Sequence, residues 1–431
     1  MTHTLTQFQF PNGLKLLLQE IHTAPIVSSW IWYGVGSRNE ISGKTGLSHW
    51  TEHMQFKGTP THPGREMDHL ISRLGGLWNA FTSADWTTYF ETLPSNALEI
   101  ALELEADRMR NSIFATEEVE VERYVILSER EGSENDPLFQ LNEAVQLLAF
   151  DQHPYRNEVL GDKSDLLALT RDDLYMHYQT YYQPSNATLC IAGDFQTDVV
   201  RGLVEKYFGK IQSQPFTPHI PTPEPVLSAS QHVELHGPGD ATFIQVAYRS
   251  PKANSTDFFA YTILDSLLAG PSSLNMFGSG GISNRTSRLY LALVDKEIAV
   301  GVYGGLNASI DPSSYTLMIT ANPDHDPDEI IRYLDAEIES LREELVDEAE
   351  IARAVKQAQA LFVYGSDNIT NQAFWMGYAN SFADYDWFTH YVDRLSAVTP
   401  ENLRRVARQY LSPDQRVVGY YQPNGNGANH G

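Results

Sequence analysis

The two halves of this chain end in the same short pattern, and this repetition limits the folds that the chain can adopt. In the first half, a helix-like segment after Thr170 leads through Pro184 into an apolar strand, and the second half repeats this order from Thr399. Four residue types recur at a separation of 229 positions: Thr170 and Thr399, Leu174 and Leu403, Tyr181 and Tyr410, Pro184 and Pro413. Four matches at one offset indicate an internal duplication. A chance match of two helix-to-strand junctions is the alternative.

A proline-rich segment separates the two halves. Residues 214–225 contain the five prolines Pro215, Pro218, Pro221, Pro223 and Pro225, which exclude a helix or a central strand. A chain of 431 residues is also too long for one ordinary core. We therefore expect an N-terminal domain at residues 1–213, a linker at 214–230 and a C-terminal repeat domain at 231–431. Each domain is predicted to be α+β, with a mixed, mostly antiparallel sheet and helices packed on one face.

Composition excludes several classes of function. The content of 42% hydrophobic and 20% charged residues is typical of a globular protein. A formal net charge of −25 argues against binding nucleic acid, and we attribute it to solvated helix faces such as residues 337–350.

The single cysteine, Cys190, lies in an apolar run and is expected to be a buried strand residue. The chain shows no secretory signal and no membrane-spanning run, so we expect a cytoplasmic protein with no membrane partner.

The N-terminal half is predicted in some detail. Alternating apolar residues around Pro11-Asn12-Gly13 predict a hairpin, and residues 26–33 predict a strand. Residues 65–74 predict a helix, and aromatic and β-branched residues at 78–82 and 86–93 predict strands. Two long helices are expected at residues 98–110 and 116–131.

The stretch His49-Trp50-Thr51-Glu52-His53 carries the chemistry. On a helix, His49 and His53 share one face, and Glu52 leans toward the same side. Two imidazoles and a carboxylate supply two zinc ligands and a base for a hydrolytic site. The order H-x-x-E-H is the inverse of the commoner H-E-x-x-H motif. An amphipathic helix with two hydrogen-bonded histidines is the alternative.

A catalytic zinc ion with two histidine ligands needs a third protein ligand. The predicted helix at 116–131 offers Glu122 and Glu129, which are seven residues apart and so share one face. Carboxylates that flank an apolar run are more often solvated than metal-bound, so spacing alone selects neither. In the second half, position 49 corresponds through the offset to position 278, in a segment (residues 270–281) without histidine or glutamate. The repeat is therefore predicted to keep the fold and lack the site.

Several motifs resemble those of the insulinase/pitrilysin family of zinc metallopeptidases, the inverzincins, and in particular the group that contains mitochondrial processing peptidase. They occur in family order and span nearly the whole chain: His49–Thr59, Asn79–Thr82, Glu122–Glu129 and Ser287–Tyr290. The resemblance implies one Zn²⁺ per chain, with His49, His53 and Glu129 as ligands. It further implies Glu52 as general base and Glu122 as a supporting catalytic acidic residue.

The resemblance also implies a substrate and a binding mode. Asn79 and Ala80 match an edge strand that takes a peptide as an added strand. The expected activity is that of an endopeptidase that hydrolyses short, extended or unfolded peptides in a closed chamber. The alternative is a non-catalytic core-type subunit of a larger assembly.

One departure from the family bears on partners. Active members use an arginine and a tyrosine from the half without zinc to hold the peptide, whereas this chain has Val294 and Val300 at the corresponding positions. We therefore expect a heterodimer with a homologous subunit that lacks the zinc motif and supplies the missing pair. A homodimer is the alternative.

Overall fold

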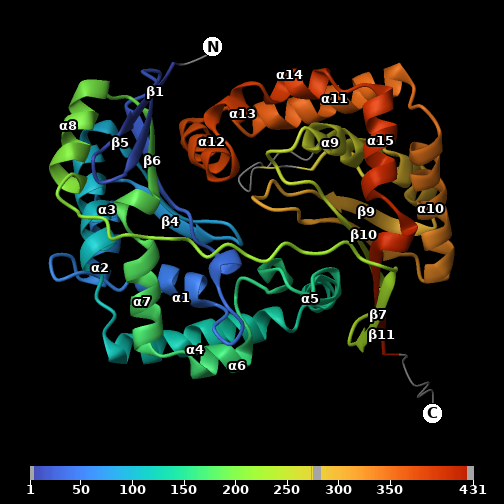
Figure 1. Ribbon diagram of the computed structural model, residues 1–431, viewed down its shortest axis with the longest axis horizontal. Coiled ribbons are helices and arrows are strands. Elements are labelled where there is room, and N and C mark those ends of the chain that lie inside the picture. The colour runs from blue at the N-terminus through green and yellow to red at the C-terminus, as the bar shows by residue number, and fades with distance from the viewer. Residues whose placement is uncertain (1–3, 273, 275–282, 425–431) are drawn as a thin grey trace. The chain divides into compact units, whose positions relative to one another are not determined.

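The computed structural model describes residues 4–272, 274 and 283–424. The chain forms two compact units, each assembled from three segments (Figure 1). The first contains residues 1–131, 157–222 and 366–388, and the second contains residues 132–156, 223–365 and 389–431. The predicted linker lies where the chain passes between units, and residues 211–230 have no helix or strand.

The first unit is built on a mixed six-stranded sheet with the order β1-β2-β6-β3-β5-β4. Only the β2–β6 pair is parallel among these neighbours. The strands are β1 (Leu5–Gln9), β2 (Lys15–Glu20), β3 (Ile26–Tyr33), β4 (Leu77–Thr82), β5 (Thr87–Pro94) and β6 (Ala187–Gly193). Cys190 lies buried in β6, as predicted. The order leaves β1 and β4 at the two edges.

Helices close to these strands in sequence cover one face of the sheet. They are α1 (Leu47–Met54), α2 (Gly64–Arg73), α3 (Leu98–Asn111), α4 (Thr116–Ser133), α6 (Lys163–Ala168), α7 (Arg171–Tyr181) and α8 (Thr197–Phe208). The core on this side includes Ile31 and Tyr33 of β3, with Trp50 of α1 and Ile126 of α4. These side chains alternate with Trp30 and Trp32, which point to the opposite face as the pleat requires.

A helix from the far end of the sequence covers the opposite face. Phe374 and Tyr378 of α12 (Ile369–Phe382) contact Trp30 and Trp32, with ring centroids 5.5 Å apart for Trp30–Phe374 and 6.4 Å for Trp32–Tyr378. The prediction that helices pack on one face holds for the helices of the N-terminal half. Helix α12, from the C-terminal half, covers the opposite face of the same sheet. The physical reason is visible in β3, which is apolar on both faces and buried along nearly its whole length.

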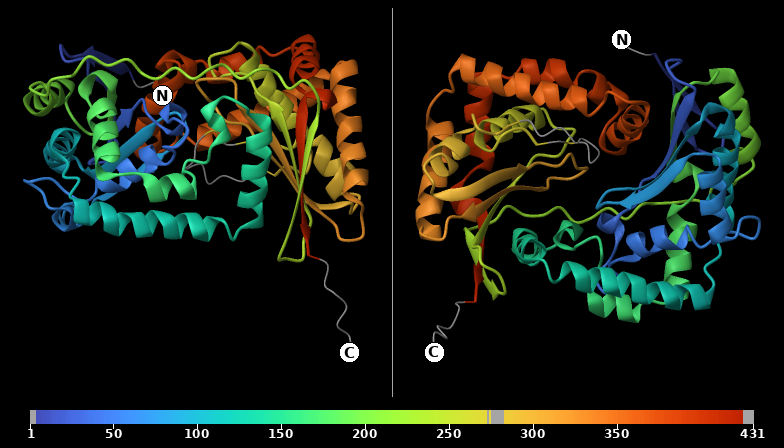
Figure 2. Two further views of the ribbon diagram at one scale, coloured as in Figure 1. Left: turned by 60° about the horizontal axis from the view of Figure 1, so that its bottom comes forward. Right: turned by 180° about the vertical axis from the view of Figure 1, so that it is seen from behind.

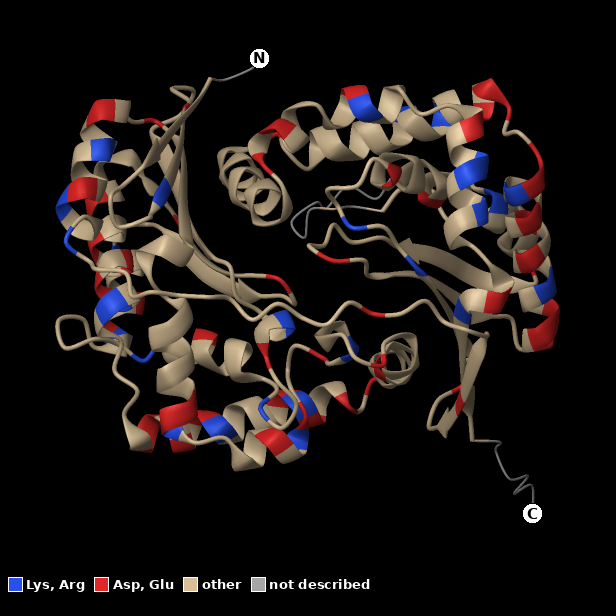
Figure 3. Cartoon of the chain, in the orientation of Figure 1, with Lys and Arg blue, Asp and Glu red and all other residues tan. Residues whose placement is uncertain are grey.

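The second unit has a mixed five-stranded sheet with the order β7-β11-β8-β10-β9. Its strands are β7 (Gln231–Gly237), β8 (Phe243–Arg249), β9 (Ala299–Gly305), β10 (Ser314–Ala321) and β11 (Arg416–Pro423). Its helices are α5 (Pro137–Ala149), α9 (Asp257–Leu268), α10 (Pro327–Glu343), α11 (Glu348–Tyr364), α14 (Tyr391–Ser396) and α15 (Pro400–Tyr410), and α13 (Tyr385–Thr389) follows α12. Figure 2 shows α10 and α15 along one side of this sheet. The acidic residues gather on helices such as α4 and α10 (Figure 3).

The duplication is visible in the topology. Strands β7-β11-β8-β10-β9 repeat the order and pairing of β2-β6-β3-β5-β4, and within the described residues the second sheet has no counterpart of β1. The short 3₁₀ turns at Pro184–Asn186 and Pro413–Gln415 lead into β6 and β11 at the predicted offset. Both α7 and α15 begin with a capping box, at Thr170 and Thr399.

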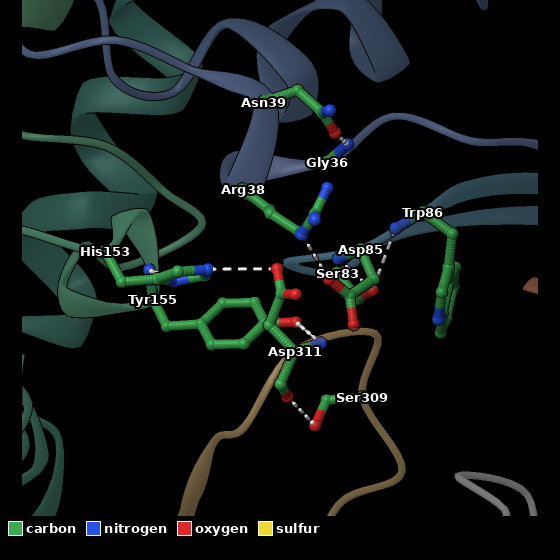
Figure 4. A network of polar contacts seen from close by, with 10 residues as sticks. All are labelled: Gly36, Arg38, Asn39, Ser83, Asp85, Trp86, His153, Tyr155, Ser309 and Asp311. Carbon is green, nitrogen blue, oxygen red and sulfur yellow. Dashed lines mark hydrogen bonds and ion pairs between the residues drawn. The ribbon is translucent and has the colours of Figure 1, made fainter. Parts of the chain in front are cut away.

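The two halves exchange one helix each. Helix α5 packs on β8 and β11 of the second unit, while α12 packs on β3 and β6 of the first. After α5, His153 is bonded through Nε2 to Asp311 Oδ2 at 3.1 Å, inside the second unit (Figure 4). The compact units thus differ from the expected division at 213 and 231 by these two helices. The central strands β3 and β8 are buried on both faces, so each sheet needs a helix on the side that the helices of its own half leave open.

Candidate metal centre

Helix α1 presents the histidine motif on the side turned away from the core. Leu47, Trp50 and Met54 are buried in the core, which leaves the side chains of His49 and His53 15% and 19% exposed on the other side. The helix start is fixed by Glu40, whose carboxylate accepts the backbone N–H groups of Gly46 at 2.8 Å and Ser48 at 2.7 Å. Glu40 thus satisfies donors that the first turn of a helix leaves free.

The loop that carries Glu40 is itself held against the turn before β5. Arg38 N donates to the Ala84 carbonyl at 2.8 Å, and the Arg38 guanidinium is 3.8 Å from the Asp85 carboxylate. Figure 4 shows this pair together with Gly36 and Ser83. A Cβ atom at Gly36 would lie 2.2 Å from the Ser83 carbonyl oxygen, so only glycine permits this approach.

Helix α4 brings a carboxylate to the two histidines. Glu129 Oε2 lies 3.9 Å from His49 Nε2 and 3.7 Å from His53 Nε2. One ligand atom from each of these three residues falls within 4.8 Å of the others, which is the only such group of metal-ligating side chains among the described residues. The structure therefore brings together the three predicted ligands.

This donor set suits zinc in chemistry and spacing. Zinc bonds imidazole nitrogen and carboxylate oxygen at about 2.0–2.2 Å, so two ligand atoms on one ion lie at most about 4.4 Å apart. Both histidine–glutamate separations, 3.9 and 3.7 Å, are within that limit. Three protein ligands leave further coordination positions for water or substrate, as in catalytic zinc sites.

Glu122 fixes the orientation of the His53 ring. Its Oε1 lies 2.8 Å from His53 Nδ1, and because a carboxylate accepts, Nδ1 carries the proton and Nε2 keeps the lone pair that can bind a metal ion. The other oxygen of Glu122 forms an ion pair with Lys57 Nζ. Glu122 is buried, and Lys57 and His53 together hold the pKa of its carboxyl group below the ordinary value despite that burial.

The electrostatics of the two histidines differ. Burial lowers the pKa of His49 to about 3, with a further contribution from His53, so this imidazole stays neutral and able to bind a cation. Burial also acts to lower the pKa of His53, but the hydrogen bond with Glu122 and the charges of Glu129 and Glu52 outweigh it and raise the pKa.

Glu52 lies in the same helix and is almost buried. Burial raises the pKa of its carboxyl group, and a hydrogen bond of 2.5 Å from the Thr82 hydroxyl opposes that rise. Thr82 is the last residue of β4, so this bond joins the motif helix to the edge of the sheet. A buried carboxyl group with a raised pKa holds a proton more readily than an exposed one, which suits a general base that later acts as an acid.

Two models of protein families match this chain. Residues 15–163 match the family model described as Insulinase (Peptidase family M16), and residues 168–358 match the model described as Peptidase M16 inactive domain. This chain belongs to the insulinase family. The assignment to a second, inactive domain corresponds to the repeat that lacks the motif.

Relatives within the insulinase family include proteins named as zinc proteases. The zinc protease PqqE of Helicobacter pylori is 28% identical over 425 residues, which cover 96% of this chain and 91% of that protein. A probable mitochondrial-processing peptidase subunit beta of Arabidopsis thaliana is 26% identical over 422 residues, covering 93% and 75%. The crystal structure of a Helicobacter pylori protease superposes with a TM-score of 0.90 at 26% identity and covers 98% of this chain and 100% of that one.

The expected substrate strand of this insulinase-family chain is at an edge. Strand β4 pairs only with β5, and its residues Asn79 and Ala80 lie opposite Phe90 and Tyr89. Asn79 is exposed and Ala80 is buried. The Ala80 N–H donates to the Asn79 side chain at 2.9 Å, so this donor is not committed to the sheet.

In the second unit, α9 follows β8 as α1 follows β3, and its sequence contains no histidine or glutamate. Position 278, which the offset predicts as the counterpart of His49, lies outside the described residues. Val294 ends a π-helical turn at Tyr290–Val294, and Val300 lies in β9 with 65% of its surface exposed.

Sequence reasoning missed three supporting side chains: Lys57, Thr82 and Glu40. Lys57 had a partial signal, because it lies only four residues after His53, although α1 ends at Met54 and Lys57 follows it in the next turn. Glu40 and Thr82 had none, because their contacts depend on how loops and strands meet in three dimensions.

None of the helices in the described ranges combines the length and the apolar character that a bilayer span requires.

Proposed function

We propose that this chain is a zinc-dependent endopeptidase subunit that hydrolyses short, extended or unfolded peptides. The observation that carries the proposal is the convergence of His49, His53 and Glu129 with Glu52 in the same helix. Bound zinc would make a water molecule acidic near neutral pH and stabilise negative charge on the scissile carbonyl oxygen. The cofactor is one Zn²⁺ per chain.

Within this proposal Glu52 is the general base. It accepts a proton from the attacking water and then gives it to the nitrogen of the leaving amine. Its raised pKa and the Thr82 hydrogen bond support both halves of that role. Glu122 acts through His53, whose ring it orients, and Lys57 keeps Glu122 ionised.

Strand β4 is the proposed peptide-binding edge. An extended peptide added alongside Asn79 and Ala80 would use backbone hydrogen bonds, which read little of the sequence. Thr82 at the end of β4 bonds to Glu52, so a peptide on this edge would pass the base. Unfolded or short peptides suit this mode because a folded protein has few free strands to offer.

Full activity is proposed to need a partner. Val294 and Val300 offer no hydrogen-bond donor where family members place an arginine and a tyrosine. A homologous subunit without the zinc motif would supply that pair and complete a closed chamber. The same two valines favour the alternative, a non-catalytic core-type subunit, whereas the complete set of ligands and base argues against it.

The Glu52→Gln substitution tests the catalytic role. It keeps the size of the side chain and removes the base, so peptide hydrolysis should fall by about 10²–10⁴-fold while zinc content stays unchanged. Metal analysis and a fluorogenic peptide assay measure the two quantities, with the exposed Glu118→Gln on α4 as the control. Full activity in the Glu52→Gln variant would refute the assignment of Glu52 as the general base. Absence of metal from the unaltered chain would refute the proposal that it is a zinc-dependent peptidase.

A further inference from the structure

A short segment at residues 160–169, called here the α6 segment, is bonded to the start of the motif helix. Asp165 Oδ2 accepts the backbone N–H of Thr45 at 3.0 Å and its hydroxyl at 2.8 Å. The Thr45 hydroxyl in turn accepts the N–H of Asp162 at 2.8 Å. Gly46, with φ +86°, packs so closely that an added Cβ would lie 2.9 Å from the Leu160 carbonyl oxygen. These contacts come directly before Leu47, where α1 begins.

The same segment is bonded to α4 through Arg123. The guanidinium donates from Nη1 to the Leu166 carbonyl and from Nη2 to the Leu169 carbonyl at 2.9 Å. Glu120 pairs with the same group, with Nη2–Oε1 at 2.8 Å. These carbonyls lie at the C-terminal end of α6, where helices leave acceptors free and favour positive charge.

Arg123 also contacts α1 directly. Its guanidinium carbon lies 4.8 Å from the centre of the Trp50 ring, a cation–π arrangement. Trp50 is fully buried, and it lies between His49 and Glu52 in the motif. Arg123 follows Glu122 and is six residues before Glu129 in α4. Arg123 thus belongs to α4, the helix that carries Glu129. Its side chain contacts both α1, the helix that carries the histidines, and the α6 segment.

We propose that Arg123 is a positioning residue that sets the spacing of α1 and α4, and so brings Glu129 within reach of His49 and His53. The planar guanidinium can stack on a ring and donate to two carbonyls at once, which lysine cannot do. A metal site tolerates displacements of only about 0.5 Å before its geometry fails. The proposal rests on the proposed function in one respect, that these three residues bind zinc.

The chain offers a matched control in Arg171. Its guanidinium lies 4.2 Å from the centre of the Tyr175 ring, donates from Nε to the Phe114 carbonyl at 2.8 Å and pairs with Asp172 at 3.2 Å. This arginine makes the same kinds of contact, but to Tyr175 and Asp172 of α7 and to Phe114, and none of these contacts is with α1 or the α6 segment. Loss of either guanidinium should cost stability, but only loss of Arg123 should weaken metal binding.

The test measures zinc affinity of the full chain by competition with a chromophoric chelator. Arg123→Met should weaken zinc binding by about 10-fold or more, the range seen when groups that orient ligands are lost, and Arg171→Met should leave it within about twofold. In a Glu129→Gln background Arg123→Met should add little further loss, because the ligand that it positions is gone. Equal zinc affinity of Arg123→Met and the unaltered chain, or full additivity with Glu129→Gln, would overturn the proposal.

A second variant covers the case in which Arg123→Met does not fold. Arg123→Lys keeps the charge but lacks the planar fork that bonds both carbonyls while lying over the Trp50 ring. It should therefore show an intermediate loss of zinc affinity, and unchanged affinity would count against the proposal. The absorption spectrum of the cobalt-substituted chain should change in shape with Arg123→Lys and not with Arg171→Lys. If the unaltered chain binds no zinc, the proposed function itself fails, which these measurements distinguish from failure at Arg123.

Discussion

At the residue scale, the groups around the ligands matter as much as the ligands. Glu122 and Lys57 decide which nitrogen of His53 is free, and Thr82 holds Glu52. None of these three contacts involves more than one hydrogen bond or ion pair, yet each fixes the direction of a side chain that the chemistry needs. Such partners are typically worth 10- to 100-fold in metal affinity.

Glu122→Gln tests this contribution. The amide keeps the shape but loses the charge that favours the Nδ1 proton of His53, so zinc affinity should fall by about 10–100-fold. Chelator competition measures the affinity, and Glu118→Gln, an exposed change on the same helix, should leave it unaltered. Unchanged zinc binding in Glu122→Gln would mean that Glu122 does not orient the ligand.

Glu40 predicts a pH dependence of stability. Burial raises its pKa from 4.5 to about 7, although the N–H groups of Ser48 and Gly46 favour the charged form. The folded chain then binds this proton more tightly than the unfolded chain, so the stabilisation is complete below pH 4.5 and is lost as the pH rises through about 7. Relative to Glu40→Gln, the metal-free chain should lose about 3 kcal/mol of unfolding free energy across this range.

Urea unfolding of both proteins below pH 5 and near pH 8 measures this difference. Glu40→Gln keeps a neutral side chain at every pH and so removes the titration of this carboxyl group. It also replaces one of the two oxygens that accept the N–H groups of Gly46 and Ser48, a loss of stability that does not vary with pH. A difference between the two proteins that stays constant with pH would show that Glu40 does not titrate in this range.

At the element scale, the sequence predicted what local pattern determines. The strand at 26–33 and the helices at 98–110 and 116–131 were expected close to their observed bounds, because period and end signals lie within each segment. The partners of α5 and α12 could not be predicted, because nothing in an apolar helix states which sheet it covers. The sequence did carry one signal that a second layer was needed: residues 30–33 of β3 are large and apolar on both faces of the strand.

The same limit applies to the candidate site. His49, Glu52 and His53 could be proposed from spacing because they lie in one helix. Glu129 lies 76 residues beyond His53, and only family resemblance selected it from the other acidic residues. Its distances to the histidines come from the packing of α4 against α1, which spacing does not encode.

Gly377 in α12 tests the packing of the exchanged helix. An added Cβ would lie 2.0 Å from Trp32 Nε1, so Gly377→Ala should force α12 away from β3 and destabilise the fold by about 1–3 kcal/mol. Gly202 in α8 has no atom within 4 Å of its Cβ position, so Gly202→Ala should stabilise by about 0.5–1 kcal/mol. The shift in urea midpoint gives both signs, and stabilisation by Gly377→Ala would contradict the packing of α12 on Trp32.

At the scale of the whole molecule, partner dependence is the main prediction. The isolated chain should bind zinc and hydrolyse a fluorogenic peptide slowly, because it lacks the proposed arginine and tyrosine. Addition of a homologous chain that carries this pair and lacks the motif should raise the rate by at least about 10-fold, as the loss of one charge-assisted contact and one hydroxyl hydrogen bond would require. The Glu52→Gln chain mixed with the same partner is the control and should stay inactive. High activity of the isolated chain would refute the heterodimer.

The helix exchange has a consequence for a chain cut within residues 214–225. The N-terminal piece would carry α5, which completes the second unit, and the C-terminal piece would carry α12, which completes the first. Neither piece could bury both faces of its own sheet, so each would need the other to fold. A cut in this linker would therefore give two fragments that fold only together. It would not give two domains that can be separated and studied alone.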